Sequence, residues 1–309
     1  MSDRRRINGP PGATRPPTFV PSPDAAKVRH QRLRKPNELR KTFLQTGLVP
    51  SASGSAYLEL EGTPGPKSAL VPTSSTIKLS CAVHGPKPLP RTASFSPNLQ
   101  LSASVKFAPF ATRVRQGYVP NSIEKDLGLH LENALKGVLL PDRWPKSAID
   151  VAVTVLEGED DEDGDRFTGA ALFNLLAAAI NVAMTALVDA KIDCLDILAA
   201  GVSAVVPGAD TKPVRILDPA AIEHEELLSS CVVGYLPSRD EVVEVWSSGG
   251  MSQQSEDGLI GYDDLVDSAI AAARGAQTVI QAVLLESVSS TQTASKKAVT
   301  RDNDIEMKT

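Results

Sequence analysis

The sequence predicts a mixed α/β fold of the α+β kind, with antiparallel content in its sheets. Several short segments alternate apolar and polar residues with a period of two, as strands do when one face of a sheet is solvated. Longer segments carry apolar residues at helical spacing or are apolar nearly all round. The order is a block of strands, a helix, a strand, a helix, more strands and a last helix, unlike a doubly wound nucleotide-binding fold.

The first block holds three predicted strands. Residues 55–61 form a short strand that ends at Gly62. Residues 76–84 alternate and stop at Gly85-Pro86, and residues 99–107 alternate strictly between apolar and polar side chains. Because one face of each is polar, we expect antiparallel, half-solvated strands.

A helix is predicted after this block. Asn121 can cap it, and Glu124 three residues later completes a capping box. An apolar residue recurs every fourth position, and Pro141 is expected to end the helix. The stripe consists of Ile123, Leu127, Leu131, Leu135 and Leu139.

The remaining elements follow the same two patterns. They are a strand at 149–155, a long helix at 168–188, a strand or pair of strands at 195–206, a brief apolar patch at 214–217, strands at 230–236 and 241–246, and a helix at 262–285. The long helix is apolar nearly all round, which is typical of a buried helix. The two late strands form a hairpin whose turn is residues 237–240.

The two ends of the chain differ from its middle. Residues 1–41 hold eleven Lys or Arg and only three acids, and the first part is rich in Pro and Gly. We expect residues 1–31 to be a disordered basic tail, either able to neutralise phosphates or simply solvated. Residues 288–309 are predicted to be a disordered polar tail, which leaves one domain at 32–287.

Composition excludes several classes of protein. The three cysteines, Cys81, Cys194 and Cys231, are too few and too scattered for a disulfide framework or a four-ligand zinc site. No uninterrupted apolar run reaches the roughly 18 residues that span a bilayer, so no membrane partner is expected. The net charge of −5 by itself argues weakly against a nucleic-acid partner.

Familiar catalytic motifs are absent from the sequence. It has no P-loop, no dinucleotide fingerprint and no nucleophile elbow. The acidic run 157–165 begins like a calcium-binding loop, but Ala170 stands where a bidentate Glu is required, so a solvated loop is expected. Residues 223–226 contain one His among acids. A zinc site would need a second His at a fixed spacing, so a polar surface is the favoured interpretation. We therefore predict no metal and no cofactor.

Arg113 and Arg115 are the most interesting basic residues inside the domain. In an extended segment, side chains at positions i and i+2 point the same way. The pair could clamp a phosphate through its guanidinium groups, or it could be an ordinary pair of surface residues.

Several short motifs, in order along residues 32–285, resemble the RNase PH family. They are the run from Leu33 to Arg40, Gly54-Ser55-Ala56-Tyr57, Val83-His84-Gly85-Pro86-Lys87, Phe107-Ala108-Pro109-Phe110-Ala111, the run from Trp144 to Asp150, and Leu217-Asp218-Pro219. Within that family the chain is most similar to the RNase PH-like ring subunits of the eukaryotic RNA exosome.

The resemblance implies an RNase PH-like fold, also described as ribosomal protein S5 domain 2-like. It would have two β-α-β-type halves, at about 32–190 and 191–287. It further implies other RNase PH-like subunits as partners in a hetero-hexameric ring, RNA-binding cap subunits, and single-stranded RNA threaded through the ring. By the same likeness, Arg113 and Arg115 would contact RNA, and the protein would reside in the nucleus, nucleolus and cytoplasm.

Departures from the family pattern predict that the chain is not an enzyme. Lys35-Pro36-Asn37 replaces the D-G-R of active members. Where those members have a phosphate loop, Arg166 follows Asp165 at the end of the acidic run, which disfavours an anion. Six residues after Asp218, where a catalytic acid is expected, stands His224.

We therefore interpret Asp165, Arg166, Asp218 and His224 as degenerate active-site positions, with no catalytic residue. The leading hypothesis is a non-catalytic structural subunit of the exosome core ring that supports 3′–5′ RNA processing and degradation. One alternative is an active phosphorolytic 3′–5′ exoribonuclease that uses Asp218 with Glu225 or Glu226. Another is a free-standing RNA-binding module dominated by its basic arm.

Overall fold

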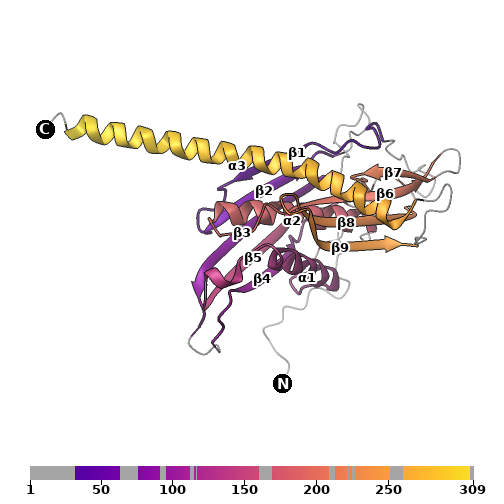
Figure 1. The fold of residues 1–309 in the computed structure, drawn as a ribbon, viewed down its shortest axis with the longest axis horizontal. Helices are drawn as coiled ribbons and strands as arrows, with labels where there is room; N and C mark the ends of the chain where they lie inside the picture. Colours follow the sequence, from indigo (N-terminus) through magenta and orange to yellow (C-terminus); the bar gives the residue numbers. More distant parts are fainter. Residues whose placement is uncertain are drawn as a thin grey trace, which may run out of the picture.

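Two sheets and three α helices make up the described part of the chain (Figure 1). The computed structural model describes residues 32–62, 76–90, 95–111, 115, 117–159, 169–208, 213–221, 223–224, 227–250 and 260–306. The predicted basic tail at 1–31 and most of the acidic run lie outside these residues. The mixed α/β class predicted from the sequence is confirmed.

The first sheet has five strands in the order β1-β2-β3-β5-β4. Their bounds are β1 Thr42–Thr46, β2 Gly54–Leu60, β3 Ile77–Pro88, β4 Gln100–Phe107 and β5 Ser147–Glu157. Neighbours are antiparallel except β4 and β5, which are parallel. The prediction that β4 is antiparallel is therefore wrong. Alternation indicates that one face of a strand is solvated, but it does not indicate which way the strand runs. A parallel pair needs a long connection, here through a helix, that returns the chain to the end of the sheet where the first strand began.

Strand β3 also runs further than expected. It crosses Gly85-Pro86 and continues to Pro88, opposite Ser147 at the start of β5, with a register shift between His84 and Lys87. Gly85-Pro86 thus marks a shift in the pairing of β3 with β5, not the end of β3.

The second sheet has four antiparallel strands in the order β7-β6-β8-β9. Their bounds are β6 Ala199–Pro207, β7 Pro213–Leu217, β8 Ser229–Leu236 and β9 Glu241–Gly249. The predicted β8–β9 hairpin is confirmed. The apolar patch at 214–217 is a strand, because it pairs with β6, and β6 is one strand that begins four residues later than predicted.

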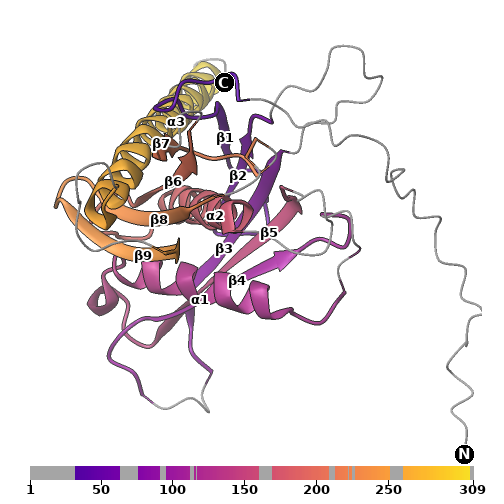
Figure 2. The same ribbon diagram turned by 90° about the vertical axis from the view of Figure 1, so that its right-hand side faces the viewer.

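Helices α1 (Ser122–Lys136) and α2 (Gly169–Asp189) lie between the two sheets (Figure 2). The capping box of Asn121 and Glu124 is present as predicted. The helix ends at Lys136, before Pro141, and Gly137 is its C-cap. Leu139 is buried beyond the helix, in a bridge with Cys194. Helix α2 is buried along almost its whole length, as its composition predicts.

Helix α3 (Tyr262–Glu306) covers the other face of the second sheet and projects beyond the body of the molecule (Figure 1). The sequence predicts that it ends at Leu285 and that residues 288–309 are disordered, yet the helix runs through Glu306. The chain contains no Pro or Gly after Gly275. Extending an existing helix costs far less than starting one, so polar composition alone does not end it.

By length and average hydropathy, α2 and the Tyr262–Ser290 part of α3 would also suffice to cross a membrane. Helix α2 meets this test as the central helix of the core, and core helices commonly do.

Both sheets contribute to one hydrophobic core around α2. Two glycines allow helices to approach the strands closely. A Cβ atom on Gly54 in β2 would lie 2.2 Å from the backbone nitrogen of Ala190, just after α2. A Cβ atom on Gly201 in β6 would lie 2.3 Å from the backbone nitrogen of Ala273 in α3. These contacts are to backbone, which cannot move aside as a flexible side chain can.

Replacing Gly201 by Ala should therefore destabilise the protein. We expect the substitution to lower the free energy of unfolding by about 3 kcal/mol, near the upper end for overpacking, because α3 must move away from β6. Urea unfolding followed by circular dichroism would measure this change. Gly250→Ala is the matched control, since a Cβ there meets nothing within 4 Å. Equal stability of the two variants would contradict the close approach of α3 to β6.

Candidate functional site

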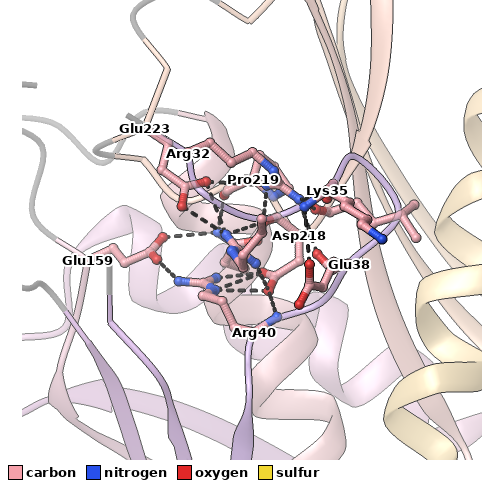
Figure 3. A network of polar contacts seen from close by, with 11 residues as sticks. Arg32, Lys35, Glu38, Arg40, Glu159, Asp218, Pro219 and Glu223 are labelled. Carbon is pink, nitrogen blue, oxygen red and sulfur yellow. Dashed lines mark hydrogen bonds and ion pairs between the residues drawn. The ribbon is translucent and has the colours of Figure 1, made fainter. Parts of the chain in front are cut away.

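Four distant parts of the chain meet in one network of charged side chains (Figure 3). They are the segment before β1, the residue Glu159 after β5, Asn174 on α2, and the segment 218–223 that follows β7. Three arginines, Arg32, Arg34 and Arg40, face three carboxylates, Glu159, Asp218 and Glu223. The formal charges of these six groups cancel.

Arg40 and Asp218 form the centre of the network. The Arg40 Nε atom lies 3.0 and 2.9 Å from the two carboxylate oxygens of Asp218, and Nη2 lies 2.6 Å from Oδ1. The backbone N–H of Arg40 donates a further bond of 2.9 Å to Oδ2. Arg40 Nη1 bonds Glu159, so its guanidinium, in a residue only 5% exposed, is held by two carboxylates. Such forked, charge-assisted bonds are among the strongest polar contacts in proteins.

Arg32 and Arg34 close the network from the other side. Arg34 Nη2 lies 3.0 Å from both carboxylate oxygens of Glu223, and its Nη1 lies 3.2 Å from Oδ2 of Asp218. Arg32 Nη1 lies 3.2 Å from Glu223, and its Nη2 donates to the carbonyl of Leu217 at 2.9 Å. These contacts hold the opening segment, residues 32–41 before β1, against the loop between β7 and β8.

Buried polar contacts extend the network into α2. The Asn174 amide nitrogen donates to Glu159 at 2.9 Å and to the Pro219 carbonyl at 2.6 Å. Asp218 itself adopts a positive φ of 50°, a conformation that costs free energy in a non-glycine residue. The bonds from Arg40 and Arg34 hold it there.

These contacts set the protonation of the site. Burial by itself would raise the pKa of Asp218, but the charge and hydrogen bonds of Arg40, with the charge of Arg34, outweigh it and lower that pKa to about 2. Burial likewise works against the charge of Arg40, and Asp218 with Glu159 raises its pKa above the ordinary value. Burial, which outweighs the charge of Glu223, lowers the pKa of His224.

The arrangement is poorly suited to proton transfer at Asp218. With a pKa of about 2, that carboxyl is protonated in only about one molecule in 10⁵ at pH 7, far from the matched value that general acid–base catalysis needs. Its oxygens already accept bonds from two arginines. Among the described residues, no group of three or more His, Cys, Asp or Glu side chains is arranged to hold a metal ion.

Of the predicted degenerate positions, the structure describes two. Asp218 lies at the network centre. His224, directly after Glu223, is half-buried, and its buried Nε2 atom has no hydrogen-bond partner among the described residues. Asp165 and Arg166 lie outside the described residues, as do Glu225 and Glu226. Arg113 also lies outside them, whereas Arg115 is described and exposed. The roles assigned to all of these residues stay predictions.

Most members of the network are not apparent from the sequence. Arg32, Arg34 and Arg40 count among the eleven basic residues of 1–41, yet all three bind carboxylates of the same chain. Glu159 was expected in a solvated loop and Glu223 on a polar surface, but both side chains are only 2% exposed. One available signal was Asn174, one of the few polar residues in a largely apolar helix, because a buried amide requires hydrogen-bond partners.

The Arg40–Asp218 pair predicts a loss of stability in acid. Between about pH 4 and pH 2 an unfolded aspartate binds a proton, while the folded Asp218 stays ionised, so protonation favours the unfolded state as the pH falls. A pKa of about 2, against 3.8, corresponds to about 2 kcal/mol.

We therefore expect the stability difference between wild type and Asp218→Asn to shrink by about 2 kcal/mol from pH 4 to pH 2. Urea unfolding across this range would measure it, with Asp126→Asn, an exposed aspartate on α1, as control. Parallel stability curves for wild type and Asp218→Asn would contradict the geometry.

Comparison with known proteins places this chain in a family. The model of the 3′ exoribonuclease family, domain 1, called RNase PH, matches residues 38–193. The "Exosome complex component MTR3" of Chaetomium thermophilum is 45% identical over 292 residues, which cover 93% of this chain and all of that relative. A protein of the same name in Schizosaccharomyces pombe is 33% identical and covers 82% of this chain and 86% of its own length.

Solved structures show the same fold. Rice Rrp46 superposes with a TM-score of 0.57 at 22% identity, over 80% of this chain and 96% of that one. A chain of the Archaeoglobus fulgidus exosome, solved with RNA bound to the active site, gives a TM-score of 0.58 at 17% identity, over 80% and 92%. The RNase PH-like fold expected from the sequence is confirmed.

The relatives also agree with a finer likeness in the sequence. Leu217-Asp218-Pro219 followed by several glutamates, and an apolar helix after an acidic run, favour the exosome subunit known as messenger-RNA transport regulator. The relatives named MTR3 confirm that resemblance. A family match over residues 38–193 and a 45% identical relative along nearly the whole chain establish that this protein belongs to the RNase PH family.

Proposed function

We propose that this chain is a non-catalytic structural subunit of the RNA exosome core ring, where it supports 3′–5′ RNA processing and degradation. We infer the absence of catalysis from the state of Asp218. The family likeness places a catalytic centre beside this aspartate. Here its carboxylate is held by Arg40 and Arg34 and its pKa is lowered to about 2.

The same charges argue against a phosphate site within the network. Three guanidinium groups could in principle attract an anion, but each is already bonded to a carboxylate. A phosphate entering there would have to displace Asp218, Glu159 or Glu223 from bonds that hold the opening segment in place. Phosphorolysis requires a bound phosphate, so this arrangement supports a structural role over the enzymatic alternative.

The partners we propose are other RNase PH-like subunits in a hetero-hexameric ring, RNA-binding cap subunits and single-stranded RNA. The support is that relatives up to 45% identical are named exosome complex components. Exposed apolar side chains on two edge strands fit such assembly, because unpaired edges and apolar surface favour association. They are Phe43 on β1 and Val242 and Val245 on β9. We also propose residence in the nucleus, nucleolus and cytoplasm, on the family likeness.

The absence of phosphorolysis can be tested directly. Purified full-length protein, incubated with inorganic phosphate and a single-stranded oligoadenylate, should release no nucleoside diphosphate above the His224→Ala/Arg166→Ala double variant. Chromatographic detection of ADP gives the measurement. Release by the wild type that the double variant lacks would establish the enzymatic alternative and reject our proposal.

Arg113 and Arg115 provide a test of RNA contact. We expect Arg113→Ala with Arg115→Ala to weaken crosslinking of single-stranded RNA to this chain within the assembled complex, and to leave co-purification of the other subunits unchanged. Loss of phosphate contacts should also reduce the dependence of binding on salt, by about 0.7 in the slope of log K against log salt for each contact. Failure of the double variant to enter the complex would instead assign the pair to a subunit interface.

A further inference from the structure

A pocket of about 280 Å³ lies where β1, β2, α2, β6 and α3 meet. Three of these elements line it with residues that have no atoms beyond Cβ, among them Ala177 on α2, Ala200 on β6 and Ala276 on α3. Leu44 and Leu58, on β1 and β2, line it as well. Benzene fills an apolar cavity of about 150 Å³, so this pocket has room for two fused rings.

Most polar groups of the lining are already paired. Asn181 donates to a β6 carbonyl at 3.1 Å and accepts from a β6 N–H at 2.7 Å. Arg40 and Asp218 bind each other, and Lys41 pairs with Glu61 at 3.2 Å. A charged ligand would give up its water without gaining an unpaired countercharge, so the pocket favours a neutral ligand.

Asn174 is the exception among these polar groups. It lines the pocket and is 2% exposed. Its amide nitrogen donates to Glu159 and to the Pro219 carbonyl, so the nitrogen is fixed and the oxygen is left as an acceptor. That Oδ1 atom is buried and has no hydrogen-bond partner among the described residues. A buried acceptor without a donor is costly, and one N–H or O–H of a ligand would supply the missing donor.

We propose that this pocket binds a small neutral aromatic molecule of about the size of indole, with its single N–H or O–H directed toward Asn174. Apolar walls with one convergent polar group are typical of ligand sites, the walls burying the ring and the polar group orienting it. A nucleobase fits less well, because several of its donors and acceptors would meet apolar walls unpaired. The inference therefore concerns a site apart from RNA contact and does not depend on the proposed role in the ring.

The test measures binding of indole to the purified full-length chain by saturation-transfer NMR. We expect saturable binding of indole and about tenfold weaker binding of benzothiophene, which has the same shape but a sulfur atom in place of the N–H. Adenine should show no saturable binding. Ala276→Phe places a ring in the pocket and should abolish indole binding. Ala282→Phe is the matched control, because Ala282 is exposed on the same helix and does not line the pocket.

Several results would overturn the proposal. No saturable binding of indole by the wild type would reject the site, as would equal binding by the wild type and a folded Ala276→Phe. Equal affinities for indole and benzothiophene would reject the bond to Asn174, and this comparison needs no variant to fold. The titration is then repeated on the complex purified through this chain. Binding retained there would support a ligand site, whereas its loss would show that a neighbouring subunit fills the pocket instead.

Discussion

The bond between Arg40 and Asp218 is the contact on which the arrangement of the whole molecule depends. It joins the segment before the first sheet to the loop of the second sheet, across 178 positions of sequence. Glu159, after β5, and Asn174, on α2, bind the same cluster, so both sheets and the helix between them share one polar centre. Leu39, next to Arg40, packs so close to α3 that a Cβ on Gly275 would lie 2.5 Å from it. The opening segment is thus held by charge on one side and by packing on the other.

A buried network of this kind stabilises only while it is complete. Removing water from six charged groups is costly, and the cost is recovered because each arginine finds a carboxylate in good geometry. Deleting one partner would leave the other charged and buried. The network therefore constrains chemistry as well as structure, since a carboxylate that holds an arginine in place is not free to exchange protons or to bind a third group. Structural use of Asp218 and catalytic use of Asp218 exclude each other.

Local patterns predicted the parts of the fold that local contacts determine. The capping box at Asn121 and Glu124, the buried α2 and the β8–β9 hairpin each depend on residues close in sequence, and all three are confirmed. The direction of β4 depends on where the chain returns after α1, which alternation along one strand does not encode. The network was missed for the same reason. An arginine that will meet a distant carboxylate has the same local signature as one that faces solvent.

Composition therefore cannot separate an arginine that builds the fold from one that faces solvent. Arg32, Arg34 and Arg40 are bound to carboxylates and contribute to the internal structure, although they lie in the most basic stretch of the sequence. Arg115, by contrast, is exposed. Counted together, these residues suggest that the amino-terminal region is the positive surface. Sorted by their partners, Arg32, Arg34 and Arg40 serve the internal network and leave no free charge for an RNA backbone. For the non-catalytic ring subunit that we propose, holding an RNA strand needs only exposed charge, whereas phosphorolysis needs groups that are free to bind a phosphate.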